Sequence, residues 1–297
     1  MAGSRERERR KARERYERQR ELQIARRRKL RQRFGIGLAV LLVLGLAGGM
    51  TVAFAGGSTS STPKAKATTS ASPSASATAS AAAVAEPATH CTYTTSGVAA
   101  AAKKVSVPPA APDYKATYTA AINTNLGPIK IDLLNSKATC TVNSFVHLAT
   151  AGYFNASQCH RVVNSGGIYV LQCGDPLAKP STKLTCSEAA NAPGTGGPGY
   201  EYDSENLPST TASTVTYKAG TVAMANSGES DSNGSQFFLV FKNTALGPDY
   251  TPFGTITSGL DILQKVANAG TSCTYSGSGG GVPKEKVVIN SVTIKQT

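Results

Sequence analysis

Charged residues are scarce outside the first 34 positions of this 297-residue chain, of which only 16% is charged overall. Residues 1–34 hold 15 of the 31 lysines and arginines, so the remainder carries 16 basic and 13 acidic residues and is nearly neutral. Among residues 1–33, Tyr16 is the one aromatic residue that could stack on bases, and no recognisable nucleic-acid-binding module follows. We therefore expect no nucleic-acid partner.

Residues 35–55 lack charged side chains, and Thr51 is their one polar residue. An uncharged, predominantly apolar run of 21 residues is long enough for a membrane-spanning helix. We interpret it as a signal anchor, although Ala53 and Ala55 also resemble a signal-peptide cleavage site. Because the basic side of an anchor stays in the cytoplasm, we predict a single-pass protein of the cell membrane whose remaining residues lie outside the cytoplasm.

Large apolar side chains are rare between residues 56 and 113, where serine, threonine, alanine and proline dominate. Such a composition buries too little apolar surface to fold by itself. We therefore predict four regions: a basic cytoplasmic tail over 1–34, the transmembrane anchor over 35–55, a disordered, low-complexity extracytoplasmic linker over 56–113, and one folded domain over 114–297.

From residue 114 onward, apolar residues recur at the two-residue period of β-strands. Strands are predicted at 116–122, 128–134, 159–163, 168–173, 220–225, 235–241, 251–256 and 287–294. One helix is predicted after the cap candidate Thr141, and another at 259–267. Because the strands do not alternate with helices in a βαβ rhythm, we predict a mainly β fold, a closed antiparallel barrel with two flanking helices.

Seven sequence segments follow one another between residues 118 and 294: LGPIKIDLL, TVNSFVHLATAGYF, HRV with LQCGDP, GTGGPGY, GTVAMANSG, NGSQFFLVF and LGPDYTPFG. Together and in this order they resemble the cyclophilin-type peptidyl-prolyl cis-trans isomerases. The resemblance implies the family's β-barrel and its activity, which is rotation about the peptide bond that precedes proline. The glycines of GTGGPGY are read as loop residues, because no Lys-Ser/Thr of a phosphate-binding loop follows them.

The resemblance implies one catalytic residue, Arg161, which follows His160 in the family's His-Arg pair. It also implies a substrate groove formed by Tyr169, Val170, Gln172, Ala225, Asn226, Ser227, Gln236, Phe238, Leu246 and Tyr250. Residues 225–227 match the segment whose backbone holds the substrate before the proline, and Phe238 matches the floor of the proline pocket. Its neighbour Phe237 faces the other side of a strand and is assigned to the core.

The residue types in this groove fit the implied chemistry. Rotation about an X-Pro bond faces a barrier of about 18–20 kcal/mol, because the nitrogen lone pair is delocalised into the carbonyl. As the bond twists, the lone pair localises on nitrogen, so a fixed arginine donor would stabilise the twisted amide more than the planar one. This rotation requires neither a cofactor nor a metal, and we predict none.

Two functions are compatible with the groove. We favour a peptidyl-prolyl isomerase that acts on exported or cell-surface polypeptides, with a monomeric catalytic domain. The alternative is a non-catalytic cyclophilin-like module that binds proline-containing protein segments.

The six cysteines, at 91, 140, 159, 173, 186 and 273, show no metal-ligand spacing. An even number of cysteines outside the membrane favours disulfide bonds. Cys159 and Cys173 flank a predicted hairpin symmetrically about Gly166, which suggests a bridge between its strands. Strict alternation would place them on opposite faces if Arg161 and Gln172 share the groove, so we expect a β-bulge at residues 164–168 to restore the match.

Overall fold

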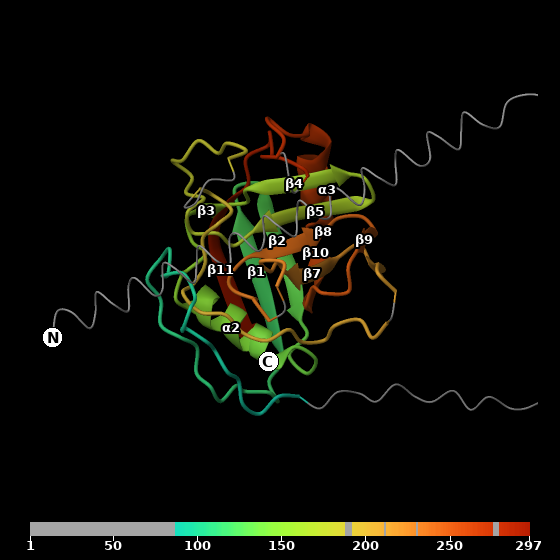
Figure 1. Ribbon diagram of the computed structural model, residues 1–297. Helices are drawn as coiled ribbons and strands as arrows, with labels where there is room; N and C mark the ends of the chain where they lie inside the picture. Colours follow the sequence, from blue (N-terminus) through green and yellow to red (C-terminus); the bar gives the residue numbers. More distant parts are fainter. Residues whose placement is uncertain (1–86, 188–191, 211, 230, 276–278) are drawn as a thin grey trace, which may run out of the picture. The chain divides into compact units, whose positions relative to one another are not determined.

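The computed structural model describes residues 87–187, 192–210, 212–229, 231–275 and 279–297 (Figure 1). The predicted tail, the predicted anchor and most of the predicted linker therefore lie outside the described residues. Within these described ranges, no helix is both long enough and apolar enough to cross a membrane.

The domain is mainly β, as predicted, with two helices. Its strands are β1 Tyr118–Thr124, β2 Gly127–Leu133, β3 Ser157–Gln158, β4 Arg161–Ser165, β5 Ile168–Cys173, β6 Val215–Tyr217, β7 Thr221–Met224, β8 Phe237–Val240, β9 Thr244–Leu246, β10 Pro252–Ser258 and β11 Val288–Gln296. The helices are α2 Thr139–Thr150 and α3 Leu260–Ala269. Three strands, β3, β6 and β9, were not predicted, because two or three residues are too few to show a period.

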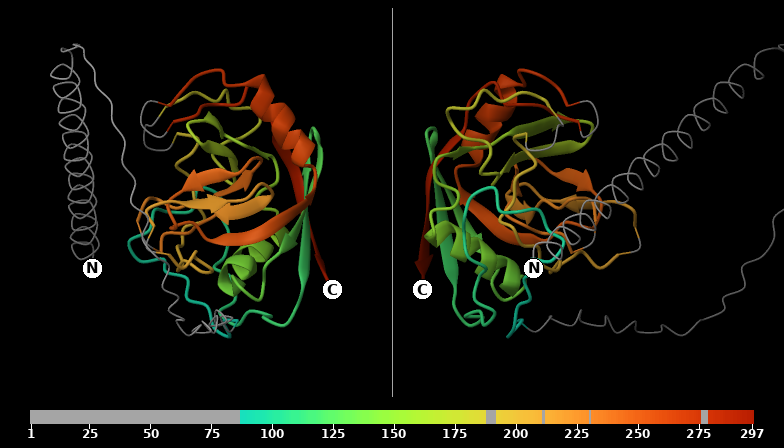
Figure 2. Two further views of the ribbon diagram at one scale, coloured as in Figure 1. Left: turned by 90° about the vertical axis from the view of Figure 1, so that its right-hand side faces the viewer. Right: turned by 60° about the vertical axis from the view of Figure 1, so that its left-hand side comes forward.

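Nine strands form one curled antiparallel sheet in the order β3-β11-β1-β2-β10-β7-β8-β5-β4, and β6 pairs with β9 separately. Its two edge strands, β3 and β4, follow one another in sequence with only Cys159 and His160 between them. No ladder joins these edges in the described part of the chain, so the predicted closed barrel is corrected to a curled sheet. Helices α2 and α3 cover opposite ends of this sheet (Figures 1 and 2).

The interior is built around phenylalanine side chains from α2 and from the sheet. Phe145 of α2 packs on Phe237 and Phe253, with ring centroids 5.6 and 5.2 Å apart. Phe237 is fully buried in this main cluster, whereas Phe238 lies in a second, smaller apolar cluster on the other face of the strand. The predicted division between these two adjacent rings is confirmed.

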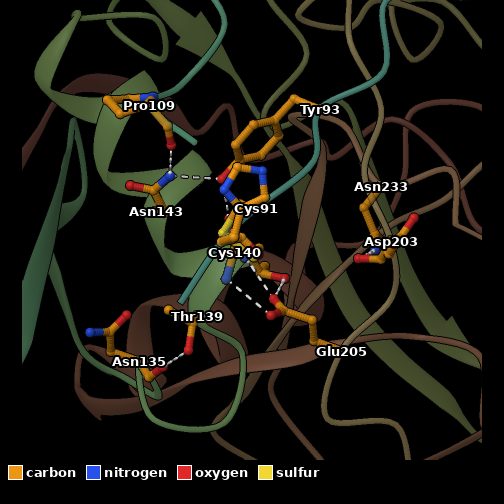
Figure 3. The surroundings of a disulfide bond; sticks show 12 residues. Cys91, Tyr93, Pro109, Asn135, Thr139, Cys140, Asn143, Asp203, Glu205 and Asn233 are labelled. Carbon is orange, nitrogen blue, oxygen red and sulfur yellow. Dashed lines mark hydrogen bonds between the residues drawn. A yellow bond between two sulfur atoms is a disulfide. The ribbon is translucent and has the colours of Figure 1, made fainter. Parts of the chain in front are cut away.

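Helix α2 begins two residues before the predicted cap Thr141, and no side chain caps it from its N-cap position at Ala138. Instead, the Glu205 carboxylate accepts hydrogen bonds from the backbone N–H groups of Cys140 and Thr141, at 3.0 and 2.7 Å (Figure 3). It also accepts one from the Thr141 hydroxyl at 2.7 Å. A distant loop therefore supplies the cap, which a local sequence pattern cannot reveal.

Residues that precede the predicted domain start at residue 114 also contact the folded domain. Residues 87–113, here called the strap, pack on the domain, and the disulfide Cys91–Cys140 joins the strap to α2 (Figure 3). The Tyr93 ring packs edge-on against the rings of Tyr200 and Tyr202, at 5.5 and 5.6 Å. The strap has too few large side chains to form a core of its own, but Tyr93 and Val105 pack against the core of the domain.

The predicted bridge Cys159–Cys173 is present, and Cys186–Cys273 completes three disulfides within the described residues. The β-bulge, however, lies elsewhere than predicted. Pairing of β4 with β5 is regular from Arg161↔Gln172 to Ser165↔Ile168, and Gly166 and Gly167, with φ of +62° and +83°, form the turn. The extra residue is His160, whose N–H also bonds to the Gln172 carbonyl at 3.1 Å. This shift brings Cys159 to the face of Cys173.

Candidate active site

Arg161 is the first residue of β4 and lies directly opposite Gln172 on β5. Among the contacts of its guanidinium, Nη1 donates to Gln172 Oε1 at 3.0 Å, and Nε donates to the Gly279 carbonyl at 3.0 Å. The Gly279 carbonyl was not anticipated from the sequence, because it comes from a loop 118 positions later in the chain. The two bonds fix the plane of the guanidinium relative to the sheet.

Gln172 also forms a hydrogen bond to Gln236, which extends the hydrogen-bond network of Arg161. Gln172 Nε2 donates to Gln236 Oε1 at 2.9 Å. Gln236 Nε2 in turn donates to the carbonyls of Gly194 and Gly196, at 3.1 and 2.9 Å. Arg161, Gln172 and Gln236, which were each assigned to the groove, are thus joined in one hydrogen-bonded chain.

Gly194 and Gly196 belong to the loop 194–197, here called the glycine loop. The fully buried carboxylate of Asp175, which was not among the predicted site residues, holds this loop. Asp175 accepts hydrogen bonds from the N–H groups of Gly194 and Gly196 and from that of Leu177. Its motif, GDP, was used only to mark the family resemblance. The buried carboxylate explains why the loop keeps a defined shape beside Gln236.

Burial sets the electrostatics around Arg161. Desolvation lowers the pKa of Arg161, an effect opposed by the nearby Tyr250 and Tyr275. The adjacent His160 is fully buried, and desolvation lowers its pKa to about 4, although Asp175 opposes the shift. At neutral pH His160 is therefore uncharged, and the positive charge at this position belongs to Arg161.

The second apolar cluster contains Val170 and Phe238, and Phe238 is the register partner of Gln172. The Phe238 and Tyr250 rings meet edge to face with centroids 5.4 Å apart, and Leu246 and Ala225 pack against the same cluster. Its six other members were not anticipated: Val163, Ile168, Val215, Tyr217, Ala223 and Val240.

Tyr169 was also assigned to the groove, but it lies neither in this cluster nor in the lining of the cleft described below. Its ring packs against the main core and lies 6.1 Å from the Phe241 ring, with the Lys242 ammonium 4.6 Å from its centroid. Since β5 is regular, alternate residues Ile168, Val170 and Gln172 share the groove face and Tyr169 points away from it.

A cleft of about 270 Å³ adjoins the network. The predicted residues Gln172, Ala225, Asn226, Ser227 and Gln236 line it, together with the glycine loop. Val98 and Ala99 of the strap also line the cleft and were not anticipated, because the strap was read as a linker. Gln172 and Gln236 of the Arg161 network thus line the cleft, while Phe238, the register partner of Gln172, belongs to the apolar cluster.

Comparisons with known proteins show the family of this chain. The family model for the cyclophilin type peptidyl-prolyl cis-trans isomerases matches residues 119–294. A probable peptidyl-prolyl cis-trans isomerase B of Mycobacterium leprae is 41% identical over 223 residues, which are 70% of this chain and 69% of that protein. Its counterpart in Mycobacterium tuberculosis is 40% identical over 192 residues, 62% of this chain and 56% of the relative.

Among solved structures, a cyclophilin type peptidyl-prolyl cis-trans isomerase of Cryptosporidium parvum aligns with 61% of this chain and 99% of its own. The two chains are 23% identical, and the TM-score is 0.44.

Proposed function

Because this chain belongs to the cyclophilin-type peptidyl-prolyl cis-trans isomerase family, we propose that it catalyses X-Pro rotation in exported or cell-surface polypeptides, with Arg161 as the residue that stabilises the twisted amide. The family model matches residues 119–294 of the domain. The observation that carries the proposed role is the bracing of the Arg161 guanidinium by Gln172 and by the Gly279 carbonyl.

Bracing matters because the transition state differs from the substrate in one respect. The proline nitrogen becomes a hydrogen-bond acceptor only when the bond is twisted, so a donor that is already fixed in place loses no free energy to reorganisation at that moment. A planar guanidinium can be held by two bonds while it still faces the substrate, which a single ammonium group cannot do as well. Arg161 therefore acts by position and charge and forms no covalent bond.

The apolar cluster and the cleft would bind different parts of the substrate. The apolar cluster around Phe238 takes the prolyl ring, whose burial between Val170, Leu246 and Tyr250 anchors the peptide. The cleft lined by residues 225–227 takes the chain that precedes the proline. The bond to be rotated then lies between them, near Arg161 and Gln172.

The location that we propose for the domain rests on the sequence and on the pairing of its cysteines. All six cysteines are paired in disulfides, which persist in oxidising compartments outside the cytoplasm. This pairing supports the proposed topology, in which residues 35–55 anchor the chain and the isomerase domain lies on the extracytoplasmic side. There it would meet polypeptides as they fold after export.

The test is a protease-coupled isomerisation assay on the full-length chain with a short X-Pro peptide. We expect Arg161→Ala to lower kcat/KM at least tenfold, which corresponds to about 1.4 kcal/mol. Lys130→Ala, which removes an exposed positive charge from β2, should retain full activity. Equal activity of Arg161→Ala and the natural chain would exclude Arg161 from the mechanism. Binding of the peptide without any catalysis would instead favour the non-catalytic module.

A further inference from the structure

One wall of the substrate cleft comes from outside the region that matches the family. Val98 and Ala99, which line the cleft, precede the start of the family match by about twenty residues. They belong to the loop 95–101 of the strap, here called the strap loop. The side chain of Val98 is half-buried at this position, while Ala99 is exposed to the open cleft.

Both ends of the strap loop are joined by backbone hydrogen bonds to the segment that carries the glycine loop. Before it, Thr94 and Glu201 exchange two bonds of 2.8 and 2.9 Å. After it, the Ala102 N–H donates to the Gly197 carbonyl at 3.0 Å. At Gly199, with φ of +83°, an added Cβ would lie 2.9 Å from that of Ala101, so the glycine permits the close approach of the two backbones.

The strap on either side of these bonds is also anchored. Before the loop, two contacts tie the strap to α2: the disulfide Cys91–Cys140 and a hydrogen bond of 2.9 Å from the Tyr93 hydroxyl to the Cys140 carbonyl (Figure 3). After it, Lys103 Nζ donates to the carbonyls of Gly152 and Tyr153, at 2.7 and 3.0 Å. The strap loop is thus held over the cleft by covalent and hydrogen-bonded contacts on both sides.

From this geometry we infer that the strap loop is a specificity-determining wall of the isomerase, which contacts the substrate residues upstream of the X-Pro pair. The inference rests on the proposed function, since the cleft of residues 225–227 is assigned to the chain that precedes the proline. At about 270 Å³ the cleft is smaller than most small-molecule pockets. Its lining is dominated by small uncharged residues, which suits an extended peptide segment with an uncharged side chain.

The consequence is a dependence on substrate length. A peptide with a single residue before the proline reaches Arg161 and the apolar cluster but not the strap loop. A peptide with three further uncharged residues enters the cleft and buries apolar surface against Val98 and Ala99. The ratio of kcat/KM for the extended peptide to kcat/KM for the truncated peptide therefore measures how much the strap loop contributes to substrate selection. The fraction of active enzyme cancels from this ratio.

The experiment compares two neighbouring alanines in the full-length chain. Both Ala99 and Ala100 are exposed, but only Ala99 lines the cleft. We expect Ala99→Trp to obstruct the cleft and lower the extended-to-truncated ratio at least fivefold, whereas Ala100→Trp should change it less than twofold. Equal ratios in the two variants would overturn the inference.

A second variant loosens the wall without placing a side chain in the cleft. Cys91→Ser combined with Cys140→Ser removes the covalent anchor of the strap, and we expect the ratio to fall towards the value of Ala99→Trp. An unchanged ratio would show that the strap does not contribute to selection. If the natural chain isomerised neither peptide, the proposed function itself would fail, which is a different result from catalysis with an unaltered ratio.

Discussion

Gln172 Oε1 accepts a hydrogen bond from Arg161 Nη1 between register partners of β4 and β5, so the orientation of the arginine depends on the sheet. The same amide donates to Gln236, which prevents it from turning its nitrogen towards Arg161. The second bond therefore selects the amide orientation that the arginine requires.

Substitutions of Gln172 distinguish the effect of its bond to Arg161 from the effect of its bond to Gln236. We expect Gln172→Leu to lower kcat by about three- to tenfold with a smaller change in KM, because Arg161 loses its orientation. Gln172→Glu keeps the acceptor for Arg161 and loses the donor to Gln236, so it should recover most of kcat. Steady-state kinetics of the two variants check this. A rise in KM with constant kcat would assign Gln172 to substrate binding instead.

The Glu205 carboxylate stabilises α2 from a distance. Glu205→Ala leaves the N–H groups of Cys140 and Thr141 without this acceptor and should lower the free energy of unfolding by about 1–2 kcal/mol. Glu205→Gln retains one acceptor oxygen and should lose less. Urea denaturation measures both against Asp132→Ala, which removes an exposed carboxylate of β2. Equal midpoints for Glu205→Ala and this control would contradict the capping role.

His160 makes stability dependent on pH. Because burial lowers its folded-state pKa to about 4 from an ordinary value near 6.5, the unfolded chain binds more protons between these values. The stabilisation is complete above about pH 6.5 and is lost as the pH falls towards 4, by about 3 kcal/mol in total. His160→Gln should flatten this slope, whereas His90→Gln, at an exposed position, should leave it unaltered. The same slope in both variants would show that other groups cause the loss.

Protease accessibility tests the proposed topology. Protease added to intact spheroplasts should cleave the chain within residues 56–86 and release a fragment that contains the folded domain. The basic residues 1–34 should remain protected until the membrane is lysed. Protection of the entire chain before lysis would reverse the orientation.

Much of the predicted groove lies in short sequence segments that occur in the same order as in the family. Arg161, Gln172, Gln236 and Phe238 each occur within a family segment, and the structure brings them together. Tyr169 was also assigned to the groove, although its ring packs against the main core, because a motif match assigns positions but does not determine the face of a strand. The register of β5 with β4 and β8 decides that face.

What the sequence determined by itself was local: the periods of the main strands and helices, the core position of Phe237, and the segments that carry the family resemblance. Only the tertiary structure decided that the strap belongs to the domain, that His160 carries the bulge, that Glu205 caps α2, and that the Gly279 carbonyl holds Arg161. The physical reason is the same in each case. These contacts join residues far apart in the chain or depend on strand register, whereas periodicity and capping signals report only on near neighbours.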